Sequence, residues 1–564
     1  MGINDNTKKL KLFSAIFLLV GGMVGSAIFS LSGLSITYAG PASILSWIIA
    51  AIIELCYGFA IAELATRYRK NGGNFVFPER TFVGRKGRLL GFLSVWGTMM
   101  ADIVSTAFAA MYIGIYLSVS FPMMGKYSNI LAIATILFCL ILNSINITTT
   151  GKVNNVLAIG LILLLAFYSI MALTCGNFSF ERFVPFFNQG DGTFGFLKAV
   201  PIAMIGYSAI TSIGFMSDEV DNPRKNIVKA MVISIIIVVL LYTLTIFVTV
   251  GNITAKELVD SKMDFIPLFA VCFNNISNKP WLANLLSIAA VFALITTILV
   301  VMAMNGRNVK AVADRGLLPS IFSKVNKANM PIYVMIVFAV ASIILSQFHS
   351  IIEILINLGA LFIVVTIVIN FISLLVTRKK NQGYENHFNV PLSSTVLILI
   401  LIIILLCYIP DIINGGYVLF VFSILWYMIG FFIYLIHSRR LYKLEVVGTV
   451  IHGNGKGKTV GMPTANIEYD KDEMEVDNGV YASKILVEGK EYIGVTNIGT
   501  RPSVDDEEKI TVETHIIDFD KDIYGQEIVL KIVDRIRDIE KFNSLSEVKK
   551  QVDKDIKYAR KIVK

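Results

Sequence analysis

Long apolar runs alternate with short polar segments over the first part of the chain. A helix needs about 20 apolar residues to cross the ~30 Å hydrocarbon core of a bilayer. Twelve runs meet this requirement, at 11–34, 39–66, 89–119, 128–146, 154–174, 196–217, 227–252, 282–306, 331–347, 351–377, 391–410 and 414–437. The pattern therefore predicts an all-α bundle of twelve transmembrane helices.

The pattern changes after residue 445. Short runs rich in β-branched residues follow at 446–452, 479–487, 492–497, 510–518 and 527–536, separated by Gly, Pro, Asn and Asp. The last stretch, 545–563, has apolar residues at helical spacing. We therefore predict a membrane domain over 1–437, a linker over 438–445 and a small β-rich domain with a C-terminal helix over 446–564.

Composition and charge support this division. The chain of 564 residues is 55% hydrophobic and 16% charged, against about 25% charged residues in soluble proteins. Residues 445–564 contain 19 basic and 24 acidic residues, whereas the rest contains 31 basic and 17 acidic ones. The basic residues of the front part concentrate in alternate loops, which predicts a multi-pass plasma-membrane protein with both termini in the cytoplasm. The net charge of +9 is therefore no sign of nucleic-acid binding, and none is expected.

Two predicted spans are interrupted by small and polar residues. The first reads Gly-Gly-Met-Val-Gly-Ser-Ala-Ile-Phe over 21–29, and the sixth reads Ile-Gly-Tyr-Ser-Ala-Ile-Thr-Ser over 205–212. Unwound backbone inside a membrane is tolerated where it lines a cavity, and paired interruptions of this kind indicate the binding site of a secondary transporter. Close packing of helices through small residues is the alternative interpretation.

The front part resembles the amino acid–polyamine–organocation (APC) permease superfamily. The resemblance rests on the first-helix signature at 22–29, on Ala62-Glu63-Leu64 followed by Gly72-Gly73, on 218–224 (DEVDNPR) and on 307–319 (RNVKAVADRGLLP). It implies a five-plus-five inverted repeat with two extra helices and uptake of a small solute, most often an amino acid. The implied substrate site comprises Gly22, Gly25, Ser26, Ala27, Tyr207, Ser208, Ala209 and Thr211.

Ionisable residues inside the predicted spans are candidates for ion coupling, because an intramembrane carboxylate is costly and is functional by default. Glu54 in the second span and Asp102 in the third are the coupling candidates. The fifth span lacks the mid-helix Lys that some APC permeases use in place of a sodium ion, so the sequence leaves coupling to protons or sodium open.

The tail contains a Gly-rich stretch, Gly453-Asn454-Gly455-Lys456-Gly457-Lys458-Thr459. It is not a Walker A loop, because the first Gly of that motif would have to stand at His452. Successive backbone N–H groups of a Gly-rich turn can still hold phosphate. An ordinary hairpin loop is the alternative.

The tail as a whole resembles the riboflavin kinase domain of bacteria and eukaryotes. The matching motifs are G-x-V-x-H-G at 448–453, G-K-x-x-G-M-P-T-A-N-I at 457–467, G-V-Y-A at 479–482, N-x-G-x-R-P-S at 497–503 and V-E-x-H-x-x-D at 512–518. The resemblance implies a six-stranded barrel that binds MgATP and riboflavin. No adenylyltransferase motif precedes it, so the expected product is FMN rather than FAD.

The resemblance also implies roles for single residues. Glu513 would be the general base for the riboflavin 5′-hydroxyl, and Thr464 and Asn466 would be oxygen ligands of Mg²⁺. Flavin would contact Arg537 and Phe542. ATP would bind Gly453, Gly455, Lys456, Gly457, Lys458, Pro463 and Thr464.

The sequence thus predicts a membrane protein that joins a secondary amino acid transporter to a cytoplasmic riboflavin kinase. Three alternatives stay open. The permease takes up riboflavin, which phosphorylation then traps inside. The tail senses a flavin or nucleotide without turnover and regulates the permease. The fusion joins two unrelated neighbouring reading frames. The expected partners are an amino acid, riboflavin, ATP and the lipid bilayer.

Overall fold

The fold was analysed in a computed structural model. It describes residues 10–69, 72–82, 85–145, 147–187, 194–261, 266–275, 280–348, 352–381, 387–414, 416–438, 445–452, 463–469, 479–501, 509–537, 539 and 545–563. Within these residues the chain divides into two compact units, the second of which includes residues 433–564.

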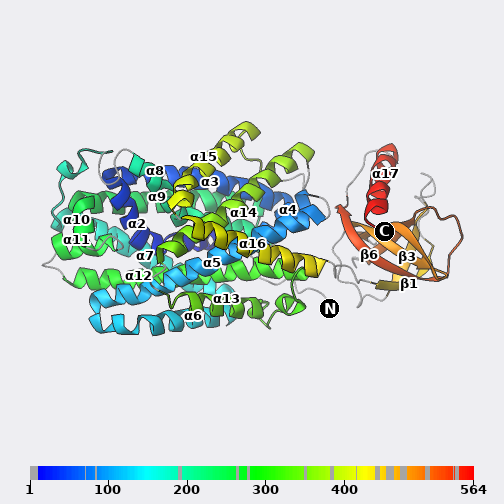
Figure 1. The fold of residues 1–564 in the computed structure, drawn as a ribbon, viewed down its shortest axis with the longest axis horizontal. Coiled ribbons are helices and arrows are strands. Elements are labelled where there is room, and N and C mark those ends of the chain that lie inside the picture. The colour runs from blue at the N-terminus through cyan, green and yellow to red at the C-terminus, as the bar shows by residue number, and fades with distance from the viewer. Residues whose placement is uncertain are drawn as a thin grey trace. The chain divides into compact units, whose positions relative to one another are not determined.

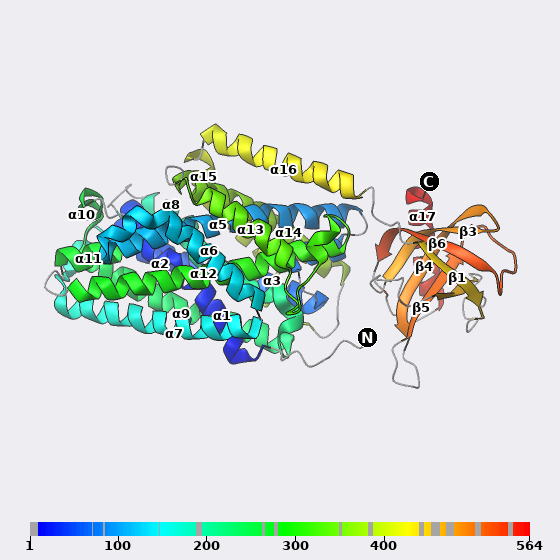
Figure 2. The same ribbon diagram turned by 90° about the horizontal axis from the view of Figure 1, so that it is seen from below.

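The first unit is a bundle of long helices that run alongside one another (Figures 1 and 2). Its α-helices are α1 (Leu12–Met23), α2 (Ser26–Ala39), α3 (Ser43–Tyr68), α4 (Gly73–Thr81), α5 (Arg85–Ser120), α6 (Ser128–Ile145), α7 (Ile147–Cys175), α8 (Gly195–Tyr207), α9 (Pro223–Asn252), α10 (Ala255–Asp260), α11 (Pro267–Asn275), α12 (Pro280–Asp314), α13 (Ile332–Leu345), α14 (Ile352–Lys380), α15 (Ser394–Asn414) and α16 (Gly416–Ser438). Short 3₁₀ segments join several of them: η1 (Gly40–Ala42), η2 (Pro122–Tyr127), η3 (Phe180–Phe183), η5 (Ser208–Glu219) and η6 (Ser320–Ser323).

The helices agree with the predicted spans. Among the described residues, ten helical stretches are long and apolar enough to cross a membrane. Two shorter apolar helices, at 332–345 and 394–409, lie where the ninth and eleventh spans were expected. Many large apolar side chains on the outer faces are exposed, as on α7 and α16, which suits a lipid environment. The chain is a multi-pass membrane protein, and the predicted fold class of this part is confirmed.

The second unit contains a closed antiparallel barrel of six strands. These are β1 (Glu445–Ile451), β2 (Ala465–Tyr469), β3 (Gly479–Val487), β4 (Lys490–Arg501), β5 (Lys509–Ile516) and β6 (Glu527–Arg537). Their order around the barrel is β1-β2-β5-β4-β3-β6. The local apolar pattern predicted all of them except β2, whose five residues follow the turn sequence at Pro463. The family resemblance, which implies six strands, accounts for the sixth, and this part of the predicted fold class is confirmed.

Alternation of side chains along each strand builds two apolar layers. One face of each strand points into the barrel, where Ile485, Ile498 and Leu530 are fully buried. On the opposite face, Val480 and Val495 pack against Ala559 of the C-terminal helix α17 (Leu545–Ile562). Figure 1 shows α17 lying across the strands. The helix therefore covers one side of the barrel and leaves the outer faces of β2 and β5 for other contacts.

Candidate functional site

The first predicted interruption is a break between two helices. Helix α1 ends at Met23 and α2 begins at Ser26, with Gly25 at φ −116° and ψ −140° between them. A Cβ at Gly25 would lie 1.9 Å from the Thr297 Oγ1 of α12, so a larger residue here would force Thr297 or the break to move. The N-terminus of α2 has no side-chain cap. Its first N–H groups are thus suited to an anionic ligand group.

The second interruption is a change of helix type. Helix α8 ends at Tyr207, and the chain continues as the 3₁₀ segment η5 over Ser208–Glu219, with a non-helical Met216 inside it. The kink at Met216 divides this segment, and the 3₁₀ stretch before it is still longer than the three or four residues that such runs seldom exceed. The sixth span therefore changes from α to 3₁₀ helix within the residues of the predicted interruption.

The two breaks face each other. A Cβ added to Gly22 would lie 3.0 Å from the Cβ of Ala209, and one added to Gly206 would lie 3.2 Å from the Cβ of Ala27. The structure therefore brings together the predicted site residues Gly22, Ala27 and Ala209 from segments about 180 positions apart. Gly206, which was not among the predicted site residues, completes the close approach.

The polar members of the predicted set are arranged differently. The Ser208 hydroxyl donates to the Ile205 carbonyl oxygen at 2.9 Å, and the Thr211 hydroxyl donates to the Ser208 carbonyl oxygen at 3.1 Å. These hydroxyls satisfy the unwound backbone locally. The side chain of Ser26 lies outside the described part of the structure.

An aromatic cluster adjoins the breaks. Tyr207 is fully buried and meets Trp47 edge-on, with ring centroids 5.8 Å apart, and lies 5.4 Å from the ring of Tyr242. The Tyr242 hydroxyl donates to the Met23 carbonyl oxygen, whereas the Tyr207 hydroxyl has no hydrogen-bond partner within the described residues. The sequence did not predict Trp47 and Tyr242 as site residues, because an aromatic residue inside an apolar span cannot be told apart from the other apolar residues.

The two coupling candidates lie on different helices. Glu54 on α3 is buried, and its Oε2 atom has no hydrogen-bond partner among the described residues. Asp102 on α5 accepts a hydrogen bond of 3.0 Å at Oδ2 from Nδ2 of Asn305 on α12. Within the described part of the chain, no hydrogen bond joins either carboxyl to the broken-helix residues.

Charged pairs outside the breaks connect helix ends. Glu219, the last residue of η5, makes two contacts with Arg307 of α12, of 2.9 and 3.2 Å. Glu63 on α3 pairs with Arg67 and with Arg378 of α14. These links tie the polar ends of the helices to one another.

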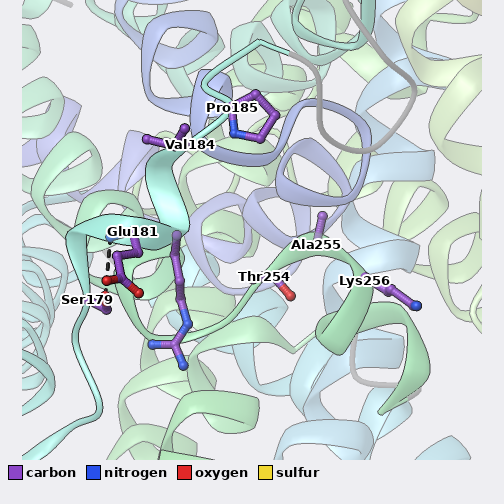
Figure 3. A pocket seen from close by; sticks show the side chains of 8 residues that line it. Ser179, Glu181, Val184, Pro185, Thr254, Ala255 and Lys256 are labelled. Atoms are coloured by element: carbon purple, nitrogen blue, oxygen red, sulfur yellow. Dashed lines mark hydrogen bonds between the residues drawn. The ribbon is translucent and has the colours of Figure 1, made fainter.

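A pocket of about 550 Å³ opens elsewhere in the bundle (Figure 3). Its lining comes from the segment around η3 and from the start of α10, and comprises Ser179, Glu181, Arg182, Val184, Pro185, Thr254, Ala255 and Lys256. None of these residues belongs to the predicted transport site. The Arg182 guanidinium is engaged by the Gly251 carbonyl oxygen at 2.8 Å, so the pocket wall is held by the loop itself.

On the barrel, three polar residues occupy one row across neighbouring strands. Asn466 of β2 lies directly opposite Glu513 of β5, which in turn lies opposite Asn497 of β4. Directly opposite residues have Cβ atoms about 4.5–5.5 Å apart and point to the same face. Val512 and Thr514 are buried, so the row faces outward. The predicted metal ligand and the predicted base are therefore neighbours, and Asn497 is a third member that had no assigned role.

A histidine holds the segment that leads into β2 close to this row of residues. His515, two residues after Glu513 and on the same face, has Nδ1 2.9 Å from the Pro463 carbonyl oxygen. A carbonyl oxygen only accepts, so Nδ1 carries the proton. This bond holds the segment with Pro463 and Thr464 against β5. The hydroxyl of Thr464 and the amide oxygen of Asn466 are neutral oxygen donors, which suits the preference of Mg²⁺ for oxygen ligands.

Arg537 lies on the same ring of residues. It pairs with Val480 of β3, which lies opposite Asn497. Its guanidinium donates to the carboxylate of Asp555 on α17 at 2.8–3.2 Å. Burial raises the pKa of Asp555, and the adjacent Arg537 opposes that rise. The predicted flavin contact thus also anchors α17 to the barrel.

The remaining predicted residues lie outside the described part of the structure. They are the phosphate-loop residues Gly453, Gly455, Lys456, Gly457 and Lys458 and the flavin contact Phe542. Their assignments stay predictions.

Comparison with known proteins matches the two units to two families. The amino acid permease family matches residues 10–433, and the riboflavin kinase family matches residues 440–563. The branched-chain amino acid permease BcaP of Bacillus subtilis (strain 168) is 26% identical over 470 residues, 78% of this chain and 94% of that protein.

The tail matches kinases of known type. The bifunctional riboflavin kinase/FMN adenylyltransferase of Listeria monocytogenes serovar 1/2a is 38% identical over 114 residues, 20% of this chain and 36% of that protein. The RNA-binding riboflavin kinase RibR of Bacillus subtilis (strain 168) is 39% identical over 111 residues, 20% of this chain and 47% of that protein. The chain therefore spans less than half the length of each of these two kinases.

Proposed function

Because this chain belongs to the amino acid permease family and carries a riboflavin kinase domain, we propose that it takes up a branched-chain amino acid and separately makes FMN in the cytoplasm. The facing breaks of the first and sixth spans carry the first half of the proposal. The row of Asn466, Glu513 and Asn497 carries the second half.

The broken helices suit a zwitterion. The uncapped N-terminus of α2 offers N–H groups to a carboxylate. At the end of α1, the Met23 carbonyl oxygen already accepts from the Tyr242 hydroxyl and from the Gly25 N–H. Ala209 places a methyl group opposite Gly22, which narrows the space between the two breaks. The buried rings of Trp47 and Tyr207 make the surroundings of the breaks apolar. A branched aliphatic substrate is also the one named for the related branched-chain amino acid permease BcaP.

The barrel row suits phosphoryl transfer to a hydroxyl group. Glu513 takes the proton of the riboflavin 5′-hydroxyl as its oxygen bonds to the γ-phosphorus of ATP, and the bond from that phosphorus to the ADP oxygen breaks. The products are FMN, ADP and a proton. Thr464 and Asn466 would hold Mg²⁺, which when bound neutralises phosphate charge. Their backbone is fixed by β2 pairing and by the His515–Pro463 bond.

The kinase half is tested with the full chain in detergent, supplied with ATP, Mg²⁺ and riboflavin. We expect FMN, and Glu513→Gln should reduce its rate by about 10²–10⁴-fold. Glu491→Gln is the matched control, since Glu491 is an exposed strand residue paired with Lys484 on the same barrel. Flavin binding without FMN formation would support a sensing role and contradict the proposal.

The permease half is tested by reconstituting the full chain in liposomes. Labelled isoleucine, leucine and valine should enter, and labelled riboflavin should not. Entry of riboflavin without amino acid uptake would support vitamin trapping instead. The orientation is tested by a tag at the C-terminus, which should become accessible only after the cells are permeabilised.

A further inference from the structure

We propose that Asp102 and Asn305 form the proton-binding site that couples uptake to a proton gradient. The inference rests on the proposed function, because it assigns the driving ion of that same permease. The two residues lie on the third and eighth spans, α5 and α12, which with 36 and 35 residues are the longest helices described.

The side chains of Asp102 and Asn305 form one of the two hydrogen bonds that a carboxyl group and an amide can share. Asn305 Nδ2 donates to Asp102 Oδ2 at 3.0 Å, and the Oδ1 atom of Asn305 is buried with no hydrogen-bond partner in the described structure. An ionised carboxylate only accepts hydrogen bonds, so it cannot satisfy this amide oxygen. A protonated Asp102 carboxyl has one O–H group, which can donate to Oδ1 of Asn305. At the same time, Oδ2 of Asp102 can still accept from Nδ2 of Asn305. One proton thus completes the pair and removes the charge.

Cations near the pair are already engaged. On α12, Arg307 is bound by Glu219, and Lys310 is bound by Asp314 at 2.6 Å. On α14, which reaches Val104 through Gly359, the described charged side chains are the C-terminal Arg378, Lys379 and Lys380. The Asp102 charge therefore has no cationic partner among the residues described, and a proton is the available means of neutralising it.

Titratable groups on the other neighbouring helices are tyrosines. On α13, joined to α5 by the hydrogen bond from Ser342 to the Ile103 carbonyl oxygen, the titratable residue is the exposed Tyr333. On α16, Tyr427 lies against Gly97 of α5, and His437 is at the helix end. A tyrosine side chain is never a cation, so neither of these two can neutralise an ionised Asp102.

The position suits coupling. Asn305 follows Thr297, the residue against Gly25 at the first break, by eight positions on α12, or about 12 Å along the helix. Asp102 is a partly buried residue, and Asn305 beside it is buried. Movement of α5 relative to α12 would separate the carboxyl from the amide, and the proton would then be released.

The test uses the full chain in proteoliposomes with labelled leucine. Counterflow, which needs no gradient, first reports whether the permease works. A gradient of about two pH units, acidic outside, should then raise accumulation by up to about 100-fold, because each pH unit is a factor of ten in proton activity. Asp102→Asn should abolish this gradient-driven accumulation and make counterflow independent of pH. Asn305→Ala should shift the pH at which uptake is half-maximal.

The control is Asn308→Ala, because Asn308 is a buried amide one turn further along α12, and the hydrogen bond to Asp102 within the described residues comes from Asn305. This variant should accumulate leucine as the unmodified chain does. Accumulation by Asp102→Asn at the wild-type level, or uptake driven by sodium and not by protons, would overturn the inference while leaving the proposed function intact. Wild-type chain that shows no counterflow would overturn the proposed function, and the inference with it. If Asp102→Asn fails to fold, an unchanged pH profile in Asn305→Ala would overturn the inference.

Discussion

Asn466 and Glu513 lie directly opposite each other in the antiparallel pair of β2 and β5. This register places a neutral oxygen donor beside a carboxylate on the outward face of the barrel. Residues that are 47 positions apart in the chain thereby form one site, and the site depends on the pairing of two strands rather than on either strand alone.

Removing the side-chain amide of Asn466 should weaken the binding of Mg²⁺ that the kinase reaction needs. We expect Asn466→Ala to lower FMN formation by about 10–100-fold at low Mg²⁺, with partial recovery at high Mg²⁺, since one oxygen ligand is lost. The measurement is the kinase rate as a function of Mg²⁺ concentration. Glu468→Gln is the control, because Glu468 is exposed on the same face of the same strand. Equal Mg²⁺ dependence in Asn466→Ala and the unmodified chain would contradict the metal assignment.

His515 should act by positioning Thr464. His515→Ala removes the bond to the Pro463 carbonyl oxygen and should raise the Mg²⁺ and ATP concentrations needed for half-maximal rate by about tenfold. His515→Asn should restore most of the affinity, because the asparagine Nδ2 can donate where the histidine Nδ1 does. Titrations of both variants provide the measurement. If the asparagine variant is as impaired as the alanine one, the hydrogen bond is not the cause.

The Arg537–Asp555 pair should hold α17 on the barrel. The two side chains are 12% and 2% exposed, so Asp555→Ala removes a carboxylate partner from a largely buried guanidinium and should cost about 3 kcal/mol of stability. Thermal inactivation of the kinase in the full chain measures this loss. Arg560→Ala is the control, because its ion pair with Asp518 is half-exposed or more on both sides.

The stability contribution of Asp555 should depend on pH. Burial raises its pKa in the folded barrel, so the folded state binds this proton more tightly than the unfolded chain. The associated stability is complete below the unfolded pKa of about 3.9 and is lost as pH rises through the folded pKa. The stability of the unmodified chain relative to Asp555→Asn should therefore fall as pH rises through that window. If the stability of the unmodified chain relative to Asp555→Asn rises with pH over the same window, the pKa of Asp555 is lowered by folding and the prediction is wrong.

Uptake should depend on the absence of a side chain at Gly25, where the break contacts α12. Gly25→Ala places a Cβ 1.9 Å from Thr297 Oγ1 and should abolish uptake. Adding Thr297→Ala removes that oxygen and leaves the Thr297 Cβ at 3.2 Å, so the double variant should recover part of the uptake. Counterflow of labelled leucine, normalised to protein in the membrane, gives the comparison. Full activity in the single variant would show that the break can move away from α12.

The local pattern of apolar and polar residues was sufficient to predict most of the helices and strands of this protein. The length and spacing of apolar runs predicted the membrane helices. Runs rich in β-branched residues predicted five strands, and apolar residues at helical spacing predicted the final helix. The interruptions in the first and sixth spans were also visible, because glycine and polar residues inside an apolar run are a local signal. Strand β2 gave no such signal, since it has five residues and begins directly after the Pro463 turn.

Tertiary structure decided what these elements bring together. The approach of Gly22 to Ala209, the hydrogen bond between Asp102 and Asn305, and the row that includes Asn497 all join positions that are distant in the chain. Helical and strand periodicity specify which face of an element is apolar, but they do not specify its neighbour or its register. Those follow from packing and strand pairing across the whole domain, where side chains must interlock and backbone hydrogen bonds must close.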